Sequence, residues 1–134
     1  MTANTLDAYL RAWNIHGDGK LETVEAMVAA MNGFLGQMGE QPSEIYRVGL
    51  NTTRLLLALG DLLVGWLLAR QAEVALARLD DLDLSAASKD RDFYTGKLAA
   101  ARFFAATVLP RLNADRRITE DTTLDVMDLP EEAF

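Results

Sequence analysis

The sequence predicts an all-α fold, a helical bundle of three to four long, mostly antiparallel helices with a short helix at the N-terminus. Only three prolines, Pro42, Pro110 and Pro130, occur in 134 residues, so long stretches can form helix without a break. Alanine and leucine are abundant, and both favour helices. Apolar residues recur at the spacing of a helix face, and no stretch shows the strict alternation of a β-strand.

The length and composition fit one globular domain. Half of the residues are apolar and a quarter are charged, which is the balance of a chain that can bury a core. We divide the expected domain 1–134 into three parts. Residues 1–19 form a short helix and a turn, residues 20–118 form the bundle, and residues 119–134 form a C-terminal tail docked on it.

The first long helix shows the clearest periodicity in the chain. It follows a short helix that Asn4 can cap and the turn sequence Gly17-Asp18-Gly19. Its apolar residues are spaced 3, 4, 3, 4 and 3 apart, which predicts a seam packed against another helix. The seam consists of Leu21, Val24, Val28, Met31, Leu35 and Met38.

The second long segment runs from Ser43, a good N-cap, to about Asp80. It forms either one long helix or two helices broken near Gly60. Beyond Gly60 the segment is apolar nearly all round, so we expect neighbouring helices to enclose it. The most apolar run comprises residues 55–69. They are fewer than the roughly 20 residues that span a bilayer, and Asp61 lies at their middle. A buried central helix is therefore expected rather than a membrane span.

The last long helix has a broad apolar face that is rich in alanine, which permits close packing. Ser88 can cap its start, and Pro110 predicts a kink as the helix continues towards Arg117. Two adjacent stripes make up the face: Phe93, Lys97, Ala100, Phe104 and Val108, and Tyr94, Leu98, Ala101, Ala105 and Leu112. The periodicity stops at Thr119, and the apolar residues after it are expected to dock on the bundle: Leu124, Val126, Met127 and Leu129.

Charge and composition exclude several functions. The net charge is −7 and the cations are scattered, which argues against nucleic-acid binding and against attraction to an anionic membrane. There is no cysteine and only one histidine, His16, so thiolate catalysis and multi-histidine metal sites are excluded. We find no nucleophile–base set and predict no catalytic and no metal-binding residue. The N-terminus has no signal region, so a cytoplasmic protein is expected.

Two further motifs are better explained by structure than by chemistry. Asn51-Thr52-Thr53 matches the N-glycosylation sequon, but it lies inside a predicted helix, so we expect no glycan there. Glu22 and Glu25 lie one turn apart, but a di-iron bundle also needs Glu-x-x-His pairs, which this sequence lacks. Both glutamates are expected on a solvated face.

Five polar or aromatic residues are candidates for an interface. Arg70 and Glu73 interrupt the most apolar segment one turn apart. They either pair with each other at the edge of the core or face a partner, where a desolvated arginine would be an anchor. Trp66 lies one turn before Arg70, in the core or at the interface. Tyr94 and Lys97 begin the last helix, where a lysine beside aromatic residues can extend to the surface or bind a ligand.

Three runs of the sequence resemble the C-terminal helical domain of a bacterial group of acyl-CoA dehydrogenases. They are YRVGLNTTRLL at 46–56, LVGWLLARQAE at 63–73, and DFYTGKLAAARFF at 92–104, which continues to VLPR at 108–111. The third run is the most specific. The ending MDLPEEAF at 127–134 is also similar to the end of such proteins, and the resemblance covers roughly residues 20–134.

The resemblance implies a flavoenzyme that oxidises acyl-CoA thioesters to 2-enoyl-CoA in fatty-acid or related acyl-CoA catabolism, with FAD and a glutamate base. In that family, two helical domains and a β domain precede the domain resembled here. The parts expected to hold FAD and the base are absent from these residues, so this chain is expected to bind no cofactor and to act as an accessory domain. Its implied partners are the catalytic domains, on the same or a separate chain. The alternative is a free-standing helical interaction module or homo-oligomer without catalytic activity.

Overall fold

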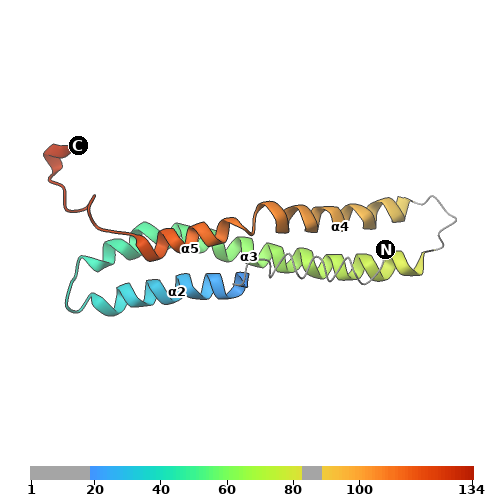
Figure 1. The fold of residues 1–134 in the computed structure, drawn as a ribbon, viewed down its shortest axis with the longest axis horizontal. Helices are drawn as coiled ribbons and strands as arrows, with labels where there is room; N and C mark the ends of the chain where they lie inside the picture. The colour runs from blue at the N-terminus through green and yellow to red at the C-terminus, as the bar shows by residue number, and fades with distance from the viewer. Residues whose placement is uncertain (1–18, 83–88) are drawn as a thin grey trace.

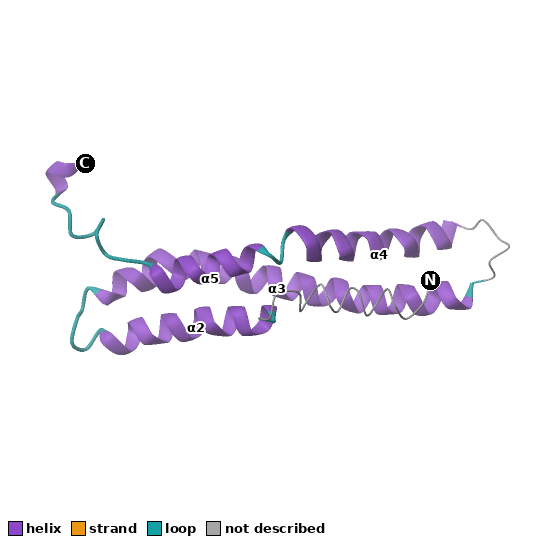
Figure 2. Cartoon of the chain, viewed as in Figure 1, coloured by secondary structure: helices purple, strands orange, loops and turns teal. Residues whose placement is uncertain are grey.

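The computed structural model describes residues 19–82 and 89–134. Within these ranges lie α2 (Lys20–Gln37), α3 (Glu44–Asp81), α4 (Lys89–Thr107), α5 (Arg111–Asp121) and the 3-10 turn η1 (Glu131–Ala133). The described residues contain no strand (Figure 2), which confirms the all-α prediction. The expected N-terminal helix with Asn4 and His16, and the expected cap Ser88, lie outside the described residues.

The bundle is organised around α3, a single helix of 38 residues that is about 57 Å long at 1.5 Å per residue. It is unbroken at Gly60. The shorter α2 returns along its N-terminal half, and α4 lies along its C-terminal half (Figure 1). Helix α5 continues the path of α4 and packs on both α2 and α3. Among the described helices, α2 and α5 therefore cover the N-terminal half of α3, and α4 covers its C-terminal half (Figure 1).

The core is built mainly from small residues of α3 and α4. Helix α3 buries Ala58, Ala69, Ala72 and Ala75, and Ala101 and Ala105 of α4 face them with Leu98. The remaining core side chains are supplied by α2 and by the α4–α5 corner: Val24, Met27, Leu109 and Leu112. Alanine faces let helices approach closely. Some leucines of α3 pack against the edges of this core, namely Leu55, Leu62, Leu68, Leu76 and Leu79, and most of its other large apolar side chains are exposed.

The expected enclosure of residues 55–69 by neighbouring helices is wrong. Leu56 is 67% exposed and Leu63 is 56% exposed. Further apolar residues of the same helix are also exposed: Leu57, Leu59, Val64, Trp66 and Leu67. The physical reason is that the neighbours of α3 cover only its alanine side.

The predicted seam on α2 is correct for only part of its members. Val24 and Met31 are buried as expected, whereas Leu21, Val28 and Leu35 are exposed. The buried face is rotated and includes other residues: Lys20, Thr23, Met27 and Phe34. The rotation has a physical cause, because α5 also packs on α2 and brings polar partners for the first turn of α2.

The expected kink at Pro110 is a complete break. Helix α4 ends at Thr107 and α5 begins at Arg111, because proline offers no N–H and its ring disrupts the preceding turn. The Leu109 N–H bonds to the Phe104 carbonyl at 3.3 Å. Leu109 is fully buried at this corner, which explains why the apolar pattern continues through the break.

Two expected contacts at the ends of elements are also corrected. Ser43 makes no side-chain cap, because its backbone is already helical and the preceding turn supplies the bonds, including Glu44 N–H to Gln41 O at 3.0 Å. The C-terminal tail is not docked on the bundle: Val126, Met127 and Leu129 are exposed. It projects away from the helices (Figure 1) because only its first residues make contacts with them.

Candidate interaction surface

A polar junction attaches α5 to α2 and α3. The Lys20 ammonium donates to Asn113 Oδ1 at 3.1 Å, and the Thr23 hydroxyl donates to the same oxygen at 3.4 Å. On the other side, the Asn51 amide donates to Thr122 Oγ1 at 2.9 Å and to the Arg47 carbonyl at 3.0 Å. Buried polar groups that are bonded in this way fix how helices pack.

Sequence reasoning missed this junction, although a signal was present. Glu44, Asn51 and Ala58 are seven residues apart on α3, so two polar side chains share the buried face with alanine. The buried amide of Asn51 agrees with the expectation that its sequon carries no glycan, since an attached sugar needs a surface position.

Two arginines of α3 also contact neighbouring helices. Arg54 pairs with Asp115 of α5 at 3.3 Å. The Arg47 guanidinium lies 3.9 Å from the centre of the Phe34 ring of α2, a cation–π contact, and pairs with Glu44 at 3.2 Å. These contacts give Arg47 and Arg54 structural roles between helices. In the described part of the chain, no three acidic or histidine side chains are grouped to hold a metal ion.

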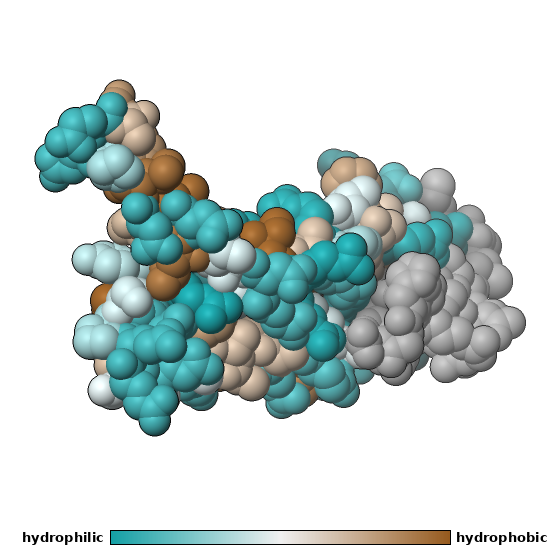
Figure 3. All heavy atoms as spheres, turned by 60° about the vertical axis from the view of Figure 1, so that its left-hand side comes forward, coloured by the Kyte–Doolittle hydropathy of each residue, from teal (hydrophilic) through white to brown (hydrophobic). Residues whose placement is uncertain are grey.

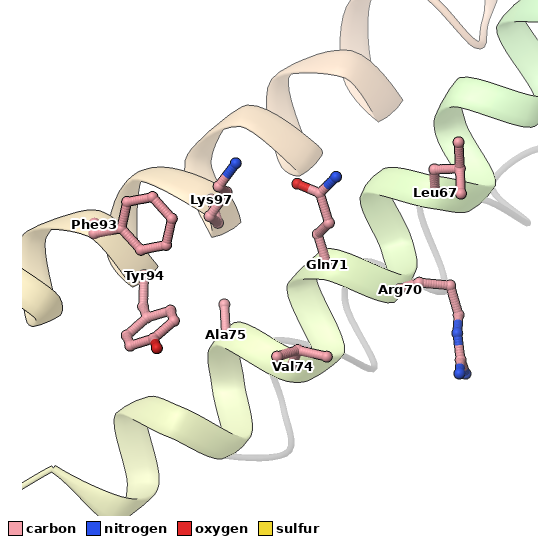
Figure 4. Close-up of a pocket in the computed structure, with 8 residues that line it drawn as sticks. All are labelled: Leu67, Arg70, Gln71, Val74, Ala75, Phe93, Tyr94 and Lys97. Carbon is pink, nitrogen blue, oxygen red and sulfur yellow. The ribbon is translucent and has the colours of Figure 1, made fainter.

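A groove between α3 and α4 contains three of the five candidate interface residues. Its cavity volume is about 490 Å³, and it is lined by Leu67, Arg70, Gln71, Val74, Ala75, Phe93, Tyr94 and Lys97. Tyr94 lies between the two helices near Ala75, and Gln71 and Lys97 extend towards the same side from facing helices (Figure 4). Arg70 extends on the other side of α3 and forms the outer rim.

The charged residues of this α3–α4 groove have simple local partners. Arg70 and Glu73 pair with each other at 2.9 Å, which is the first of the two arrangements considered for them. Arg70 is 65% exposed, so this pair adds little stability. Lys97 places its ammonium 5.3 Å from the centre of the Phe93 ring, and Phe93 meets Tyr94 edge-on. The groove therefore combines an aromatic wall with a cation on each rim.

A second groove lies between α2 and α3 and is almost wholly apolar. It has a volume of about 460 Å³ and is lined by Leu21, Leu59, Leu62, Leu63 and Trp66. Trp66 is 52% exposed, so it is not a core residue of this chain. The five candidates therefore do not form one site: Trp66 belongs to this α2–α3 groove, and Glu73 lines neither groove.

The two grooves differ in the polar groups that they offer. Among the described residues that line them there is no carboxylate, histidine or aliphatic hydroxyl, and the titratable side chains are Arg70, Tyr94 and Lys97, all in the α3–α4 groove. Helix α3 is also the one described helix that is long and apolar enough, by length and composition alone, to cross a membrane.

The fold and its grooves define an all-α helical domain, with buried alanines on α3 and α4 and exposed leucines on α3. The chain matches the family model described as "Acetyl-CoA dehydrogenase C-terminal like" over residues 6–130, and it belongs to this family. It is thus the C-terminal type of domain of acyl-CoA dehydrogenases and not their catalytic part.

Two curated relatives are acyl-CoA dehydrogenases. The chain is 41% identical, over 88% of its length, to the broad-specificity linear acyl-CoA dehydrogenase FadE5 of Mycobacterium tuberculosis. It is 34% identical, over 65% of its length, to a butyryl-CoA dehydrogenase of Syntrophomonas wolfei. The matches span 21% of the first relative and 14% of the second. The similarity therefore concerns one part of much longer enzymes.

Proposed function

We propose that this chain is an accessory domain of an FAD-dependent acyl-CoA dehydrogenase that acts in fatty-acid or related acyl-CoA catabolism in the bacterial cytoplasm. The catalytic domains, on the same or a separate chain, bind FAD and carry the base that removes the substrate proton. The accessory domain binds to them through its apolar surface and supplies no residue to the chemistry. No cofactor is assigned to this chain.

The observation that carries the proposal is the exposed apolar surface of α3. Leu56, Leu59, Leu63 and Trp66 are spaced 3, 4 and 3 apart, so they form one stripe along the helix. All four are exposed, and three of them line the α2–α3 groove. A contiguous apolar stripe of this kind marks an interaction surface. A helix that buries its alanines and exposes its leucines has its larger hydrophobic face available for a partner.

The test begins with the native protein in its source cells. Antibody against this chain is used to capture it, and the captured material is analysed for mass, flavin absorbance and acyl-CoA-dependent reduction of an electron-acceptor dye. We expect flavin and dehydrogenase activity to be captured with the chain, and non-specific antibody to capture neither. Capture of the chain at its own mass, without flavin and without activity, would contradict the proposal.

A pair of matched variants tests the surface. Leu56→Glu places a charge on the exposed stripe of α3, and Ile118→Glu makes the same change at an exposed position of α5. Where the catalytic domains lie on a separate chain, we expect Leu56→Glu to reduce the captured flavin and activity at least tenfold while Ile118→Glu leaves them unchanged, because a charge in a desolvated interface is costly; where they lie on the same chain, Leu56→Glu and not Ile118→Glu should lower the melting temperature of the enzyme. Equal results for the two variants would show that the stripe does not contact the catalytic domains.

A further inference from the structure

The C-terminal tail has the composition of a docking peptide. It presents apolar side chains outside the bundle, with Phe134 85% exposed and Leu129 50% exposed. Acidic residues alternate with them: Asp125, Asp128, Glu131 and Glu132. The projecting end of the molecule carries apolar atoms beside hydrophilic ones in the space-filling view (Figure 3). A large exposed aromatic side chain is the usual anchor of such a peptide.

The α3–α4 groove has the complementary chemistry. Phe93, Tyr94, Leu67 and Val74 offer it an apolar and aromatic lining. Lys97 lies on one rim and Arg70 on the other, and no carboxylate is among the described residues that line it. Arg70 donates to Glu73 through one terminal nitrogen. A guanidinium has five N–H donors, so Arg70 can also donate to a second carboxylate. Although the chain has a net charge of −7, this groove is locally cationic and can therefore bind an acidic peptide.

The tail does not lie in the groove of its own chain. Its first residue after α5, Thr122, is bonded to Asn51 at 2.9 Å, and beyond it the tail projects away from the helices at the end of the molecule opposite α4 (Figure 1). Leu67, at the near edge of the groove, lies sixteen residues further along α3, which is about 24 Å in the other direction. Twelve extended residues from Thr122 to Phe134 span up to about 43 Å, so the direction of the tail, and not its length, favours the groove of a second copy.

We propose that the tail of one copy of this chain docks into the α3–α4 groove of a second copy. Phe134 and Leu129 enter the aromatic lining, and the carboxylates of Asp128 and Glu131 meet Lys97 and Arg70 at the rims. The exchange is reciprocal in a two-fold dimer, since each copy carries one tail and one groove. It uses a different surface from the stripe proposed to contact the catalytic domains, so the two proposals stand or fall separately.

The first test is sedimentation velocity of the 134-residue chain over roughly 1 to 100 µM, the range in which small interfaces associate. We expect a concentration-dependent dimer. Phe134→Ala should weaken it about tenfold or more, the usual effect of losing an aromatic anchor. Lys97→Glu should weaken it too, and adding Glu131→Lys with Glu132→Lys should restore it. Lys89→Glu, an equal charge change at an exposed position of the same helix, is the matched control and should have no effect.

The second test locates the tail directly. A photo-crosslinking amino acid replaces Phe134, and nitrogen-14 and nitrogen-15 labelled chains are mixed before irradiation. We expect cross-links between differently labelled chains, at peptides that contain residues 67–75 or 93–97. A chain that stays monomeric over the whole range, a dimer unaffected by Phe134→Ala, or cross-links only within one chain or to other segments would each overturn the proposal.

Discussion

Leu112 and Leu63 give a direct comparison of the inner and outer surfaces of this bundle. Leu112 is fully buried, where α5 closes the core, whereas Leu63 is 56% exposed on α3. Leu112→Ala removes a packed side chain and leaves a cavity, so it should lower the free energy of unfolding by about 2.7–5 kcal/mol. Leu63→Ala removes the same atoms from a half-solvated position, so its effect should stay within about 0.5 kcal/mol.

The assay is urea unfolding of the isolated chain, followed by far-ultraviolet circular dichroism. The difference between the two variants then reports burial alone, because the chemical change is identical. If the proposed docking is correct, Leu63→Ala should also lower the melting temperature of the assembled enzyme, because the proposal places that residue against the catalytic domains. A loss above about 2 kcal/mol for Leu63→Ala in the isolated chain would refute the assignment of an outer face to α3. Its absence of effect in the whole enzyme would refute the docking argument.

Three further outcomes are expected. Gly60→Ala should stabilise the isolated chain by about 0.5–1 kcal/mol in urea unfolding, because Gly60 lies inside α3 with nothing within 4 Å of an added Cβ; destabilisation would show that the site is not open. Asn51→Ala should cost about 0.5–1.5 kcal/mol in the same assay, because it removes the hydrogen bonds from the buried amide to Thr122 and to the Arg47 carbonyl, while the Thr122 hydroxyl keeps its bond to the Ile118 carbonyl; a neutral effect would contradict the polar junction. In flotation assays the chain should not rise with anionic phosphatidylserine vesicles, because its net charge is −7 and such surfaces attract cations; co-flotation would favour a membrane for the α3 surface.

The sequence predicted the number and kind of elements well, because helix formation depends on local properties. Few prolines, many alanines and leucines, and repeated apolar spacing indicated three long helical segments, and the structure has them. Of the two stripes predicted for the buried face of α4, one was placed correctly: Leu98, Ala101 and Ala105 are buried. The adjacent stripe is only partly covered, since Phe93 and Ala100 are exposed.

The buried faces of α2 and α3 could not be assigned in this way. Residues 55–69 are apolar nearly all round, so hydrophobic periodicity does not indicate which side packs within the chain and which side packs elsewhere. The side of α3 that is buried is the one with the small residues, because alanines allow the closest approach of a neighbouring helix. On α2 the outcome depended on Asn113, a residue 90 positions from Thr23 along the chain, and no local pattern contains that information.

The same reasoning explains why the candidate interface was only partly foreseen. Arg70, Tyr94 and Lys97 were selected as polar or aromatic residues at the edge of apolar helices, and they do line one groove. Trp66 was selected for its place in sequence near Arg70, and the two residues do lie four apart, on the same side of α3. Trp66 nevertheless lines the α2–α3 groove and Arg70 the α3–α4 groove, because the helix that packs beside α3 changes from α2 to α4 along its length.

The division of α3 into an alanine side and a leucine side has a consequence for the domain as a whole. Burying a leucine gains about 1.5–3 kcal/mol, considerably more than burying an alanine methyl group. A chain selected only for its own stability would place its leucines between its helices. This chain buries Ala58, Ala69 and Ala72 and exposes Leu56, Leu63 and Leu67 instead. Much of the hydrophobic stabilisation that α3 can supply is therefore not realised among the described helices, and this is the arrangement that the proposed docking to larger catalytic domains requires.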